Sequence, residues 1–428
     1  MSVPSNLTRK LSRASIWLIN GMWAIPVVLL IRVLRPIVLF RMGTLESTRI
    51  GHFVTDGAEQ LARYQQRPTN TFDWYWLGET CNSQWERMIR RSLPVHACVK
   101  YLDRWNRVLP GGSAHERPSS YTFSRDIEGL FARFNVEMPF LPTETVEALA
   151  WLRSKGWKDG EPFVCLLVRD DEYLANNRLH GDGTAAAFDR RAYHSYRNSD
   201  IDTYLPAIRW LTGQGVWVIR MGKLMAKPLP TGMDLVVDYA FDHEKSDLLD
   251  IWLFANCAGC VSTATGLDQL SMMYGRPLLC VNALPLGDFF SWGQNMWTPK
   301  TLQWAETGQI LSISENLVNK WSTSREYDRA GIKIVDLRAD EITAAVQEFW
   351  GRCVGTWEED PKDFQRQEEF WNIFEKWPKY ATYHGERHRS ARVGAAWLSS
   401  LSLAAIKSTS VANDNDSIQQ DVENDTPG

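Results

Sequence analysis

A run of small and hydroxylated residues at 261–267 is the part of the sequence best suited to bind an anion. It follows an apolar segment and precedes a helical pattern, so backbone N–H groups and the positive end of a helix dipole would point at a ligand. Ser262, Thr263 and Thr265 add hydroxyl donors without crowding a diphosphate, and Gly266 leads into the helix. The run predicts a phosphate-binding turn, with ordinary helix capping by Thr263 or Thr265 as the alternative.

Two arginines stand directly after apolar runs that have the character of strands. Arg169 follows the run 163–168, and Arg220 follows the run 216–219. Because the carboxyl ends of parallel strands meet at one edge of a sheet, both guanidinium groups are expected to face the same anionic ligand. A structural pairing of Arg169 with Asp170 or Asp171 is the alternative.

The segment 193–202 crowds aromatic, cationic and carboxylate side chains just before a helical pattern. Arg197 suits bidentate binding of a phosphate, Asn198 suits a base or a sugar, and Ser199 suits a helix start. Capping by Ser199 with a solvated Arg197 is the alternative, but it leaves the rest of the cluster, including Tyr193, unexplained.

His52 lies beside Gly51, at the start of a helical pattern that follows a short strand. An imidazole with a pKa near neutrality can take the proton of an attacking hydroxyl. We therefore predict His52 as a general base, with Asp56 and Glu59, one turn along, as substitutes. A histidine satisfied by backbone hydrogen bonds is the alternative.

The sequence favours chemistry without a bound metal ion. Asp200 and Asp202 lie at a predicted helix start, where both carboxylates have capping roles, and no other Asp-x-Asp pair follows a predicted donor-site strand. Cys257 and Cys260 form a CxxC motif, yet no second CxxC or spaced histidine pair accompanies it. We interpret the motif as strand packing rather than as a zinc or redox site.

Strands and helices alternate along most of the chain, which predicts an α/β fold. We expect a Rossmann-like domain at 36–158 and a second one at 159–345, each doubly wound and together facing a cleft. Aromatic-rich helices at 346–407 are expected to brace both domains. The polar tail 408–428 has the composition of a disordered segment.

The N-terminal segment 1–35 carries the one membrane signal. Residues 14–31 contain no charged side chain, and Arg9, Lys10, Arg13, Arg32 and Arg35 flank them. The stretch is short for a span and is interrupted by polar and helix-breaking residues, so an in-plane or re-entrant anchor is the favoured prediction. Packing of a first helix on the protein itself is the alternative.

Composition narrows the classes of partner. The chain has 428 residues, a formal charge of −4 and 44% hydrophobic residues. The negative net charge gives no positive field to attract nucleic acid, and the hydrophobic fraction is too ordinary for a polytopic membrane protein. The seven cysteines show no disulfide framework and predict a reducing cytosol.

Five motifs together give the chain a family likeness. They lie at 49–53, 167–174, 196–207, 218–222 and 265–268. With them, the chain resembles an uncharacterised bacterial family of glycosyltransferases associated with surface-polysaccharide biosynthesis. The resemblance covers roughly residues 36–400 and implies a GT-B-like fold with the donor mostly on the second domain. Two departures stand out: Ala264 replaces an expected glycine, and Asp56-Gly57 replaces an expected Asn-Thr pair.

We therefore expect a metal-independent glycosyltransferase on the cytoplasmic side of the inner membrane, peripheral or monotopic, that moves a sugar from a nucleotide sugar to a saccharide or lipid-linked acceptor. No cofactor is expected, since the nucleotide sugar is a co-substrate, and neither is nucleic acid. A nucleotide-sugar epimerase or hydrolase and an inactive carbohydrate-binding scaffold are the alternatives. The predicted catalytic residues are His52, Asp56 and Arg169. The predicted donor-binding residues are Asp170, Tyr193, Arg197, Asn198, Arg220, Met221, Gly222, Ser262, Thr263, Thr265, Gly266 and Asp268.

Overall fold

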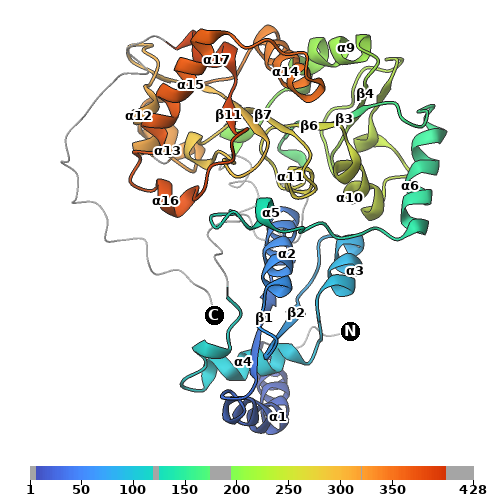
Figure 1. Ribbon diagram of the computed structural model, residues 1–428, viewed down its shortest axis with the longest axis vertical. Helices are drawn as coiled ribbons and strands as arrows, with labels where there is room; N and C mark the ends of the chain where they lie inside the picture. Colours follow the sequence, from blue (N-terminus) through green and yellow to red (C-terminus); the bar gives the residue numbers. More distant parts are fainter. Residues whose placement is uncertain (1–5, 119–124, 174–193, 320, 402–428) are drawn as a thin grey trace.

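The computed structural model describes residues 6–118, 125–173, 194–319 and 321–401. Tyr193 and the tail 408–428 lie outside them, so the predictions for both stay untested. Figure 1 shows two unequal parts: a large body around one sheet, and a narrower N-terminal part that extends away from it.

The body is built on a parallel sheet of seven strands in the order β11-β8-β7-β6-β3-β4-β5. Its strands are β3 (Phe163–Leu167), β4 (Trp217–Arg220), β5 (Val236–Val237), β6 (Gly259–Ser262), β7 (Leu278–Ala283), β8 (Asn295–Pro299) and β11 (Arg392–Val393). Most of these residues are buried, as expected for strands covered on both faces. Without β11, this is the order of a doubly wound dinucleotide-binding fold, with its switch point between β3 and β6.

Helices cover both faces of the sheet. They are α9 (Leu205–Gly213) and α14 (Ala339–Val354) on one side, and α10 (Asp247–Asn256) and α11 (Asp268–Met273) on the other (Figure 1). The prediction of a parallel α/β sheet in the second half of the chain is confirmed.

The N-terminal part differs from the predicted domain. Its strands β1 (Leu39–Leu45) and β2 (Thr71–Leu77) pair in parallel, and within the described residues they form a two-stranded sheet of their own. The described residues do not show the doubly wound sheet expected at 36–158: beyond β1 and β2, only single parallel bridges at Val95 and Glu116 extend this sheet, and helices make up most of the rest. These helices are α3 (Ser83–Ser92), α4 (Val99–Val108), α5 (Leu130–Arg133) and α6 (Pro142–Ser154), and α2 (Ile50–Gln65) lies between β1 and β2 in sequence.

Helix α1 (Asn6–Val33) packs at the far end of this part. In the described residues, no helix is both long enough and apolar enough to cross a membrane.

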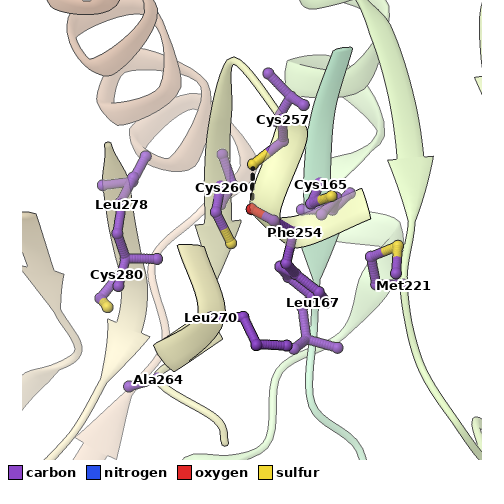
Figure 2. Close-up of a cluster of buried hydrophobic side chains, with 14 of the residues drawn as sticks. Cys165, Leu167, Met221, Phe254, Cys257, Cys260, Ala264, Leu270, Leu278 and Cys280 are labelled. Carbon is purple, nitrogen blue, oxygen red and sulfur yellow. Dashed lines mark hydrogen bonds between the residues drawn. The ribbon is translucent and has the colours of Figure 1, made fainter. Parts of the chain in front are cut away.

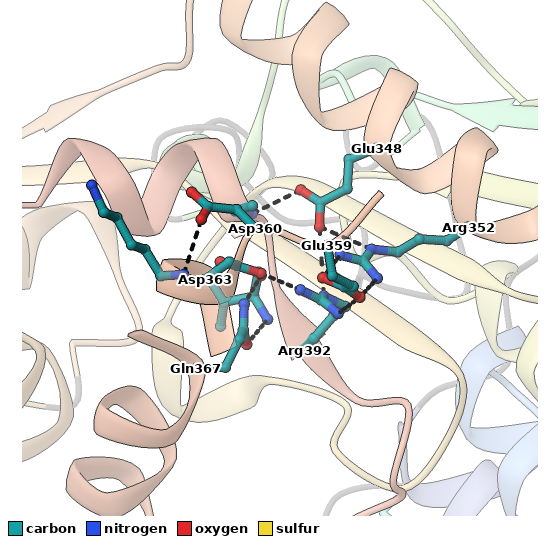
Figure 3. A network of polar contacts seen from close by, with 10 residues as sticks. Glu348, Arg352, Glu359, Asp360, Asp363, Gln367 and Arg392 are labelled. Carbon is teal, nitrogen blue, oxygen red and sulfur yellow. Dashed lines mark hydrogen bonds and ion pairs between the residues drawn. The ribbon is translucent and has the colours of Figure 1, made fainter. Parts of the chain in front are cut away.

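The C-terminal helices pack on the large body, and the segment at Tyr383 also contacts the N-terminal part. These are α15 (Pro361–Phe374), α16 (Tyr380–Tyr383) and α17 (Ala395–Ser400), and they follow α12 (Ile313–Val318), α13 (Ser324–Arg329) and the antiparallel pair β9 (Thr301–Trp304) and β10 (Ile332–Val335). An ionic network centred on Arg392, Glu348 and Asp363 ties α14, α15 and β11 together (Figure 3). On the other side, Arg125 donates a hydrogen bond of 3.3 Å to the carbonyl of Tyr383.

The cysteines of the CxxC motif lie in the core of the sheet. Cys257 and Cys260 are fully buried, and the Cys257 thiol donates to the Phe254 carbonyl at 3.3 Å (Figure 2). Both are free thiols. The interpretation of this motif as packing is confirmed.

Candidate anion-binding site

The switch point of the sheet brings together two of the predicted segments. Arg169 follows β3, and the turn that begins with Thr263 follows the neighbouring strand β6. The Arg169 amide donates to Thr263 Oγ1 at 3.0 Å, and the Thr263 amide donates to the Leu167 carbonyl at 3.1 Å. In doubly wound sheets, ligands bind at this point, outside the carboxyl ends of the strands.

Two arginines from different segments lie at this turn. Arg197 donates through Nη2 to the carbonyl of Ala264, and its own segment is held by a 3.0 Å bond from the Ser199 amide to the Arg169 carbonyl. Burial lowers the pKa of Arg169 to about 10, and the charge of Arg197 adds to this effect. Two cations so close together favour an anionic partner.

The charges of arginines from both parts of the molecule act on His194. Its pKa is lowered to about 4, first by burial and then by the charges of Arg169, Arg197 and Arg49. Arg49 directly precedes α2, so the field over the turn comes from both parts of the molecule. We call Arg49, Arg169 and Arg197 the cationic cluster; His194 beside it is neutral at pH 7.

Several buried polar atoms at the cluster have no hydrogen-bond partner among the described residues. They are Arg169 Nε, Arg197 Nε and Thr265 Oγ1. A buried donor without an acceptor costs about 1–3 kcal/mol, so each such atom calls for an explanation. The oxygens of a bound phosphate are the acceptors that this set lacks.

A buried carboxylate, that of Asp268, fixes the shape of the turn through hydrogen bonds. Asp268 accepts from the Ser262 hydroxyl at 2.7 Å and from the Thr265 amide at 2.6 Å. Burial raises the pKa of Asp268 to about 6. Ser262 and Asp268 therefore shape the turn instead of presenting groups to a ligand, and one of the amides expected at the helix start is already bonded.

The first turn of α2, which carries His52, begins against the turn after β6. A Cβ atom added to Gly51 would lie 2.8 Å from Gly266 Cα, so the two backbones are in direct contact. His52 is half-buried, and its pKa is lowered by burial and by Arg49, while Glu46 opposes the shift. The imidazole is therefore neutral at pH 7 and can accept a proton.

The predicted substitutes for His52 have other partners. Both oxygens of Asp56 bind Arg117, at 2.8 and 3.0 Å, and one of them also accepts from the Glu46 amide. Glu59 pairs with Arg63 at 2.8 Å. Asp56 is a buried structural carboxylate, so its assignment as a catalytic residue is corrected.

Arg220 is also bound by a side chain of the protein and does not face the expected ligand. Its side chain is 1% exposed, pairs with Asp238 at 3.1 Å and lies over the ring of Phe241. It follows that the end of β4 contributes a structural ion pair instead of a second free guanidinium. Met221 is buried in the core, and the space beside Gly222 is filled by Met225.

The remaining predicted polar residues hold loops near the site. Asp170 accepts from the amides of Glu172 and Ala226, at 3.0 and 2.8 Å. The Asn198 side chain donates to Asp171, and the backbone carbonyl of Asn198 accepts from Lys300 at 2.6 Å. These contacts position Arg169 and Arg197, and the side-chain oxygen of Asn198 has no hydrogen-bond partner in the described part of the chain.

Three residues at the site were not given a role from sequence. Arg49 and His194 both lie inside motifs singled out there, but their convergence depends on the docking of α2. Lys300 follows β8 and is buried against Asp336 at 2.7 Å, and no local pattern marks it. Within the part of the chain that the structure describes, no group of three or more His, Cys, Asp or Glu residues is placed to hold a metal ion.

No family model and no curated protein matches the chain. A solved glycosyl transferase family 9 structure from Veillonella parvula DSM 2008 is similar at 8% identity and a TM-score of 0.35, over 60% of this chain and 84% of that one. The E. coli ADP-heptose lps heptosyltransferase II is similar at 11% identity and a TM-score of 0.34, over 61% and 85%. Both are glycosyltransferases, but likenesses this weak carry no argument about this chain.

Proposed function

We propose that the protein transfers a sugar from a nucleotide sugar to a saccharide or lipid-linked acceptor, without a metal ion. The observation that carries the proposal is the gathering of Arg49, Arg169 and Arg197 at the switch point of the sheet, beside a neutral imidazole. Such a site offers positive charge for a diphosphate and a base for a hydroxyl.

The diphosphate of the donor would lie over the turn after β6. Arg169 and Arg197 carry the buried Nε donors that have no acceptor in the described part of the structure, and Thr265 adds a hydroxyl. Guanidinium groups form strong charge-assisted bonds to phosphate. They would take over the role that Mg²⁺ has in other transferases, stabilising the negative charge of the leaving group.

The proton of the acceptor would go to His52. As the acceptor oxygen forms its bond to the anomeric carbon, the bond from that carbon to the diphosphate breaks, and the electron pair leaves with the diphosphate. The hydroxyl proton passes to the neutral imidazole, whose pKa is kept low by burial and by Arg49. Because the base comes from the N-terminal part, the acceptor would approach from that side, in assembly of a surface polysaccharide at the cytoplasmic face of the inner membrane.

The test is a transfer assay with a panel of nucleotide sugars and saccharide acceptors, run with and without EDTA. The proposal predicts a released nucleoside diphosphate that depends on the acceptor and is insensitive to EDTA. Equally fast release without acceptor would indicate a hydrolase or an epimerase, and loss of turnover with EDTA would refute metal independence.

The base is tested with a matched pair of variants. His52→Ala should lower kcat by about 10²–10⁴-fold, the usual contribution of general base catalysis. His243→Ala is the control, because that side chain is 90% exposed and lies outside the site. Normal turnover of His52→Ala would remove His52 from the mechanism.

A further inference from the structure

One face of helix α1 is apolar and open to solvent. The side chains of this face are Ile19, Met22, Trp23, Leu29, Leu30 and Val33, with exposed fractions from 38% for Trp23 to 80% for Met22. At 100° per residue they cover one side of the helix, and Pro26 lies among them, also exposed. Contiguous exposed apolar surface of this kind marks an interaction site in a folded protein.

The opposite face of α1 is already occupied. Ala24, Val28 and Ile31 are buried in a small core with Leu102 and Trp105 of α4. Gly21 allows close approach, because an added Cβ atom would lie 2.5 Å from the ring of Trp105. This helix is therefore fixed to the protein along one side and cannot be surrounded by lipid.

The end of α1 is pinned as well. Arg32 donates to the carbonyl of Pro110 at 2.6 Å and to the carbonyl and side chain of Asn106, each at 2.9 Å. Helices α1 and α4 lie at the end of the molecule farthest from the large sheet (Figure 1).

The end of the molecule that carries this face has a surplus of basic residues. The segments 19–37 and 98–112 contain five basic residues and one acidic residue, which is Asp103. Asp103 is buried and binds Arg107 at 3.1 Å and the indole of Trp76 at 2.9 Å. Arg35, just past the end of α1, is exposed. A net positive charge at this end is complementary to an anionic lipid surface.

A second copy of the chain fits this surface less well. A two-fold interface would place the same patch against itself and so oppose like charges.

We propose that the outward face of α1 docks flat on an anionic bilayer, so that the helix lies in the membrane plane. The apolar side chains enter the region of the lipid headgroups and upper acyl chains, and the net positive charge of this end of the molecule favours anionic lipid. This inference is independent of the transferase reaction, because it rests on contacts outside the cationic cluster.

The test is flotation of the full-length protein with vesicles of phosphatidylcholine alone and of phosphatidylcholine mixed with phosphatidylglycerol. The unaltered protein should float with the mixed vesicles at low salt, more weakly at high salt, and least with phosphatidylcholine alone. Failure to bind the mixed vesicles at low salt would overturn the proposal.

Variants locate the contact. Met22→Glu combined with Val33→Glu should weaken binding to mixed vesicles by about tenfold or more, since apolar contact is lost and negative charge is added. Val146→Glu on α6 is the control, because Val146 is similarly exposed at 63% but lies on another helix. Equal binding of the double variant and the control would overturn the proposal.

Sedimentation equilibrium of the same proteins tests the alternative that a second copy of the chain covers this face. A dimer that the double variant dissociates, in a protein that ignores vesicles, would assign the face to a second copy.

Discussion

Gly51 and Gly266 touch through their backbones, and this contact joins the N-terminal part to the turn after β6. A Cβ atom on Gly51 would lie 2.8 Å from Gly266 Cα, and one on Gly266 would lie 3.0 Å from the Gly51 amide nitrogen. A bulkier residue at either position would hold α2 away from the turn. The contact therefore sets the distance of His52 and Arg49 from the arginines of the sheet.

Replacement of Gly51 by alanine should lower the free energy of unfolding, although alanine usually stabilises a helix. Alanine favours a helix over glycine by up to about 1 kcal/mol, but here the methyl group meets backbone and should cost about 1–3 kcal/mol. We expect a net loss of stability in urea unfolding and lower sugar transfer. Gly213→Ala, at the exposed end of α9 with no atom within 4 Å, should be neutral or stabilising. Stabilisation by both variants would contradict the close approach.

Ala264→Gly should stabilise the protein. Ala264 has a φ of 56°, in the left-handed region that disfavours side chains. Glycine there should raise the free energy of unfolding by about 0.5–1 kcal/mol, which urea unfolding would measure. Ala344→Gly, inside α14, should instead lower it by about 1 kcal/mol. A loss of stability in both variants would contradict strain at Ala264.

The acid limb of the pH–rate profile should respond to the neighbours of His52. The pKa of His52 lies below 6.5, so the base stays neutral at pH 7 and kcat/KM should fall only as the pH drops below that value. Arg49→Gln removes a charge that lowers this pKa and should move the limb to higher pH. Glu46→Gln removes a charge that raises it and should move the limb to lower pH. Shifts in the same direction would argue against His52 as the titrating base.

Asp268→Asn should change how stability depends on pH. The folded pKa of about 6 lies above the ordinary 3.8, so the folded protein binds this proton more tightly, and the contribution of Asp268 to stability is lost as the pH rises through that window. Asparagine can still accept from Ser262 and Thr265 but carries no charge. The variant should be more stable than the parent above the window, by about 1–3 kcal/mol, and similar below it. Urea unfolding on both sides of the window measures the difference, and a constant difference would contradict the assignment.

The sequence predicted the large sheet well because its signals are local. Continuous apolar runs such as 163–168 indicate buried parallel strands, and the residues at their ends fall at the carboxyl edge by topology alone. The glycine that the family resemblance implies at position 264 suits the left-handed backbone that the turn adopts there.

What the sequence could not predict depends on tertiary partners. Arg220 follows its strand as Arg169 does, yet Asp238 holds it inside the protein. The position of Asp56 suited a base, but in the fold it pairs with Arg117, which lies sixty-one residues later in the sequence. The N-terminal part began with a strand, a glycine turn and a helix, but the segment after β2 formed helices, so a second large sheet did not arise.

Calorimetric titration with nucleoside diphosphates tests the central claim most directly. We predict that Arg169→Gln and Arg197→Gln each weaken binding by about 1.5–3 kcal/mol, the usual worth of a hydrogen bond to a charged group. Arg153→Gln, which removes an exposed pair with Asp159 on the far helix α6, should leave the affinity unchanged. Equal affinities in all three variants, or no binding by the parent protein, would contradict a diphosphate site at the switch point.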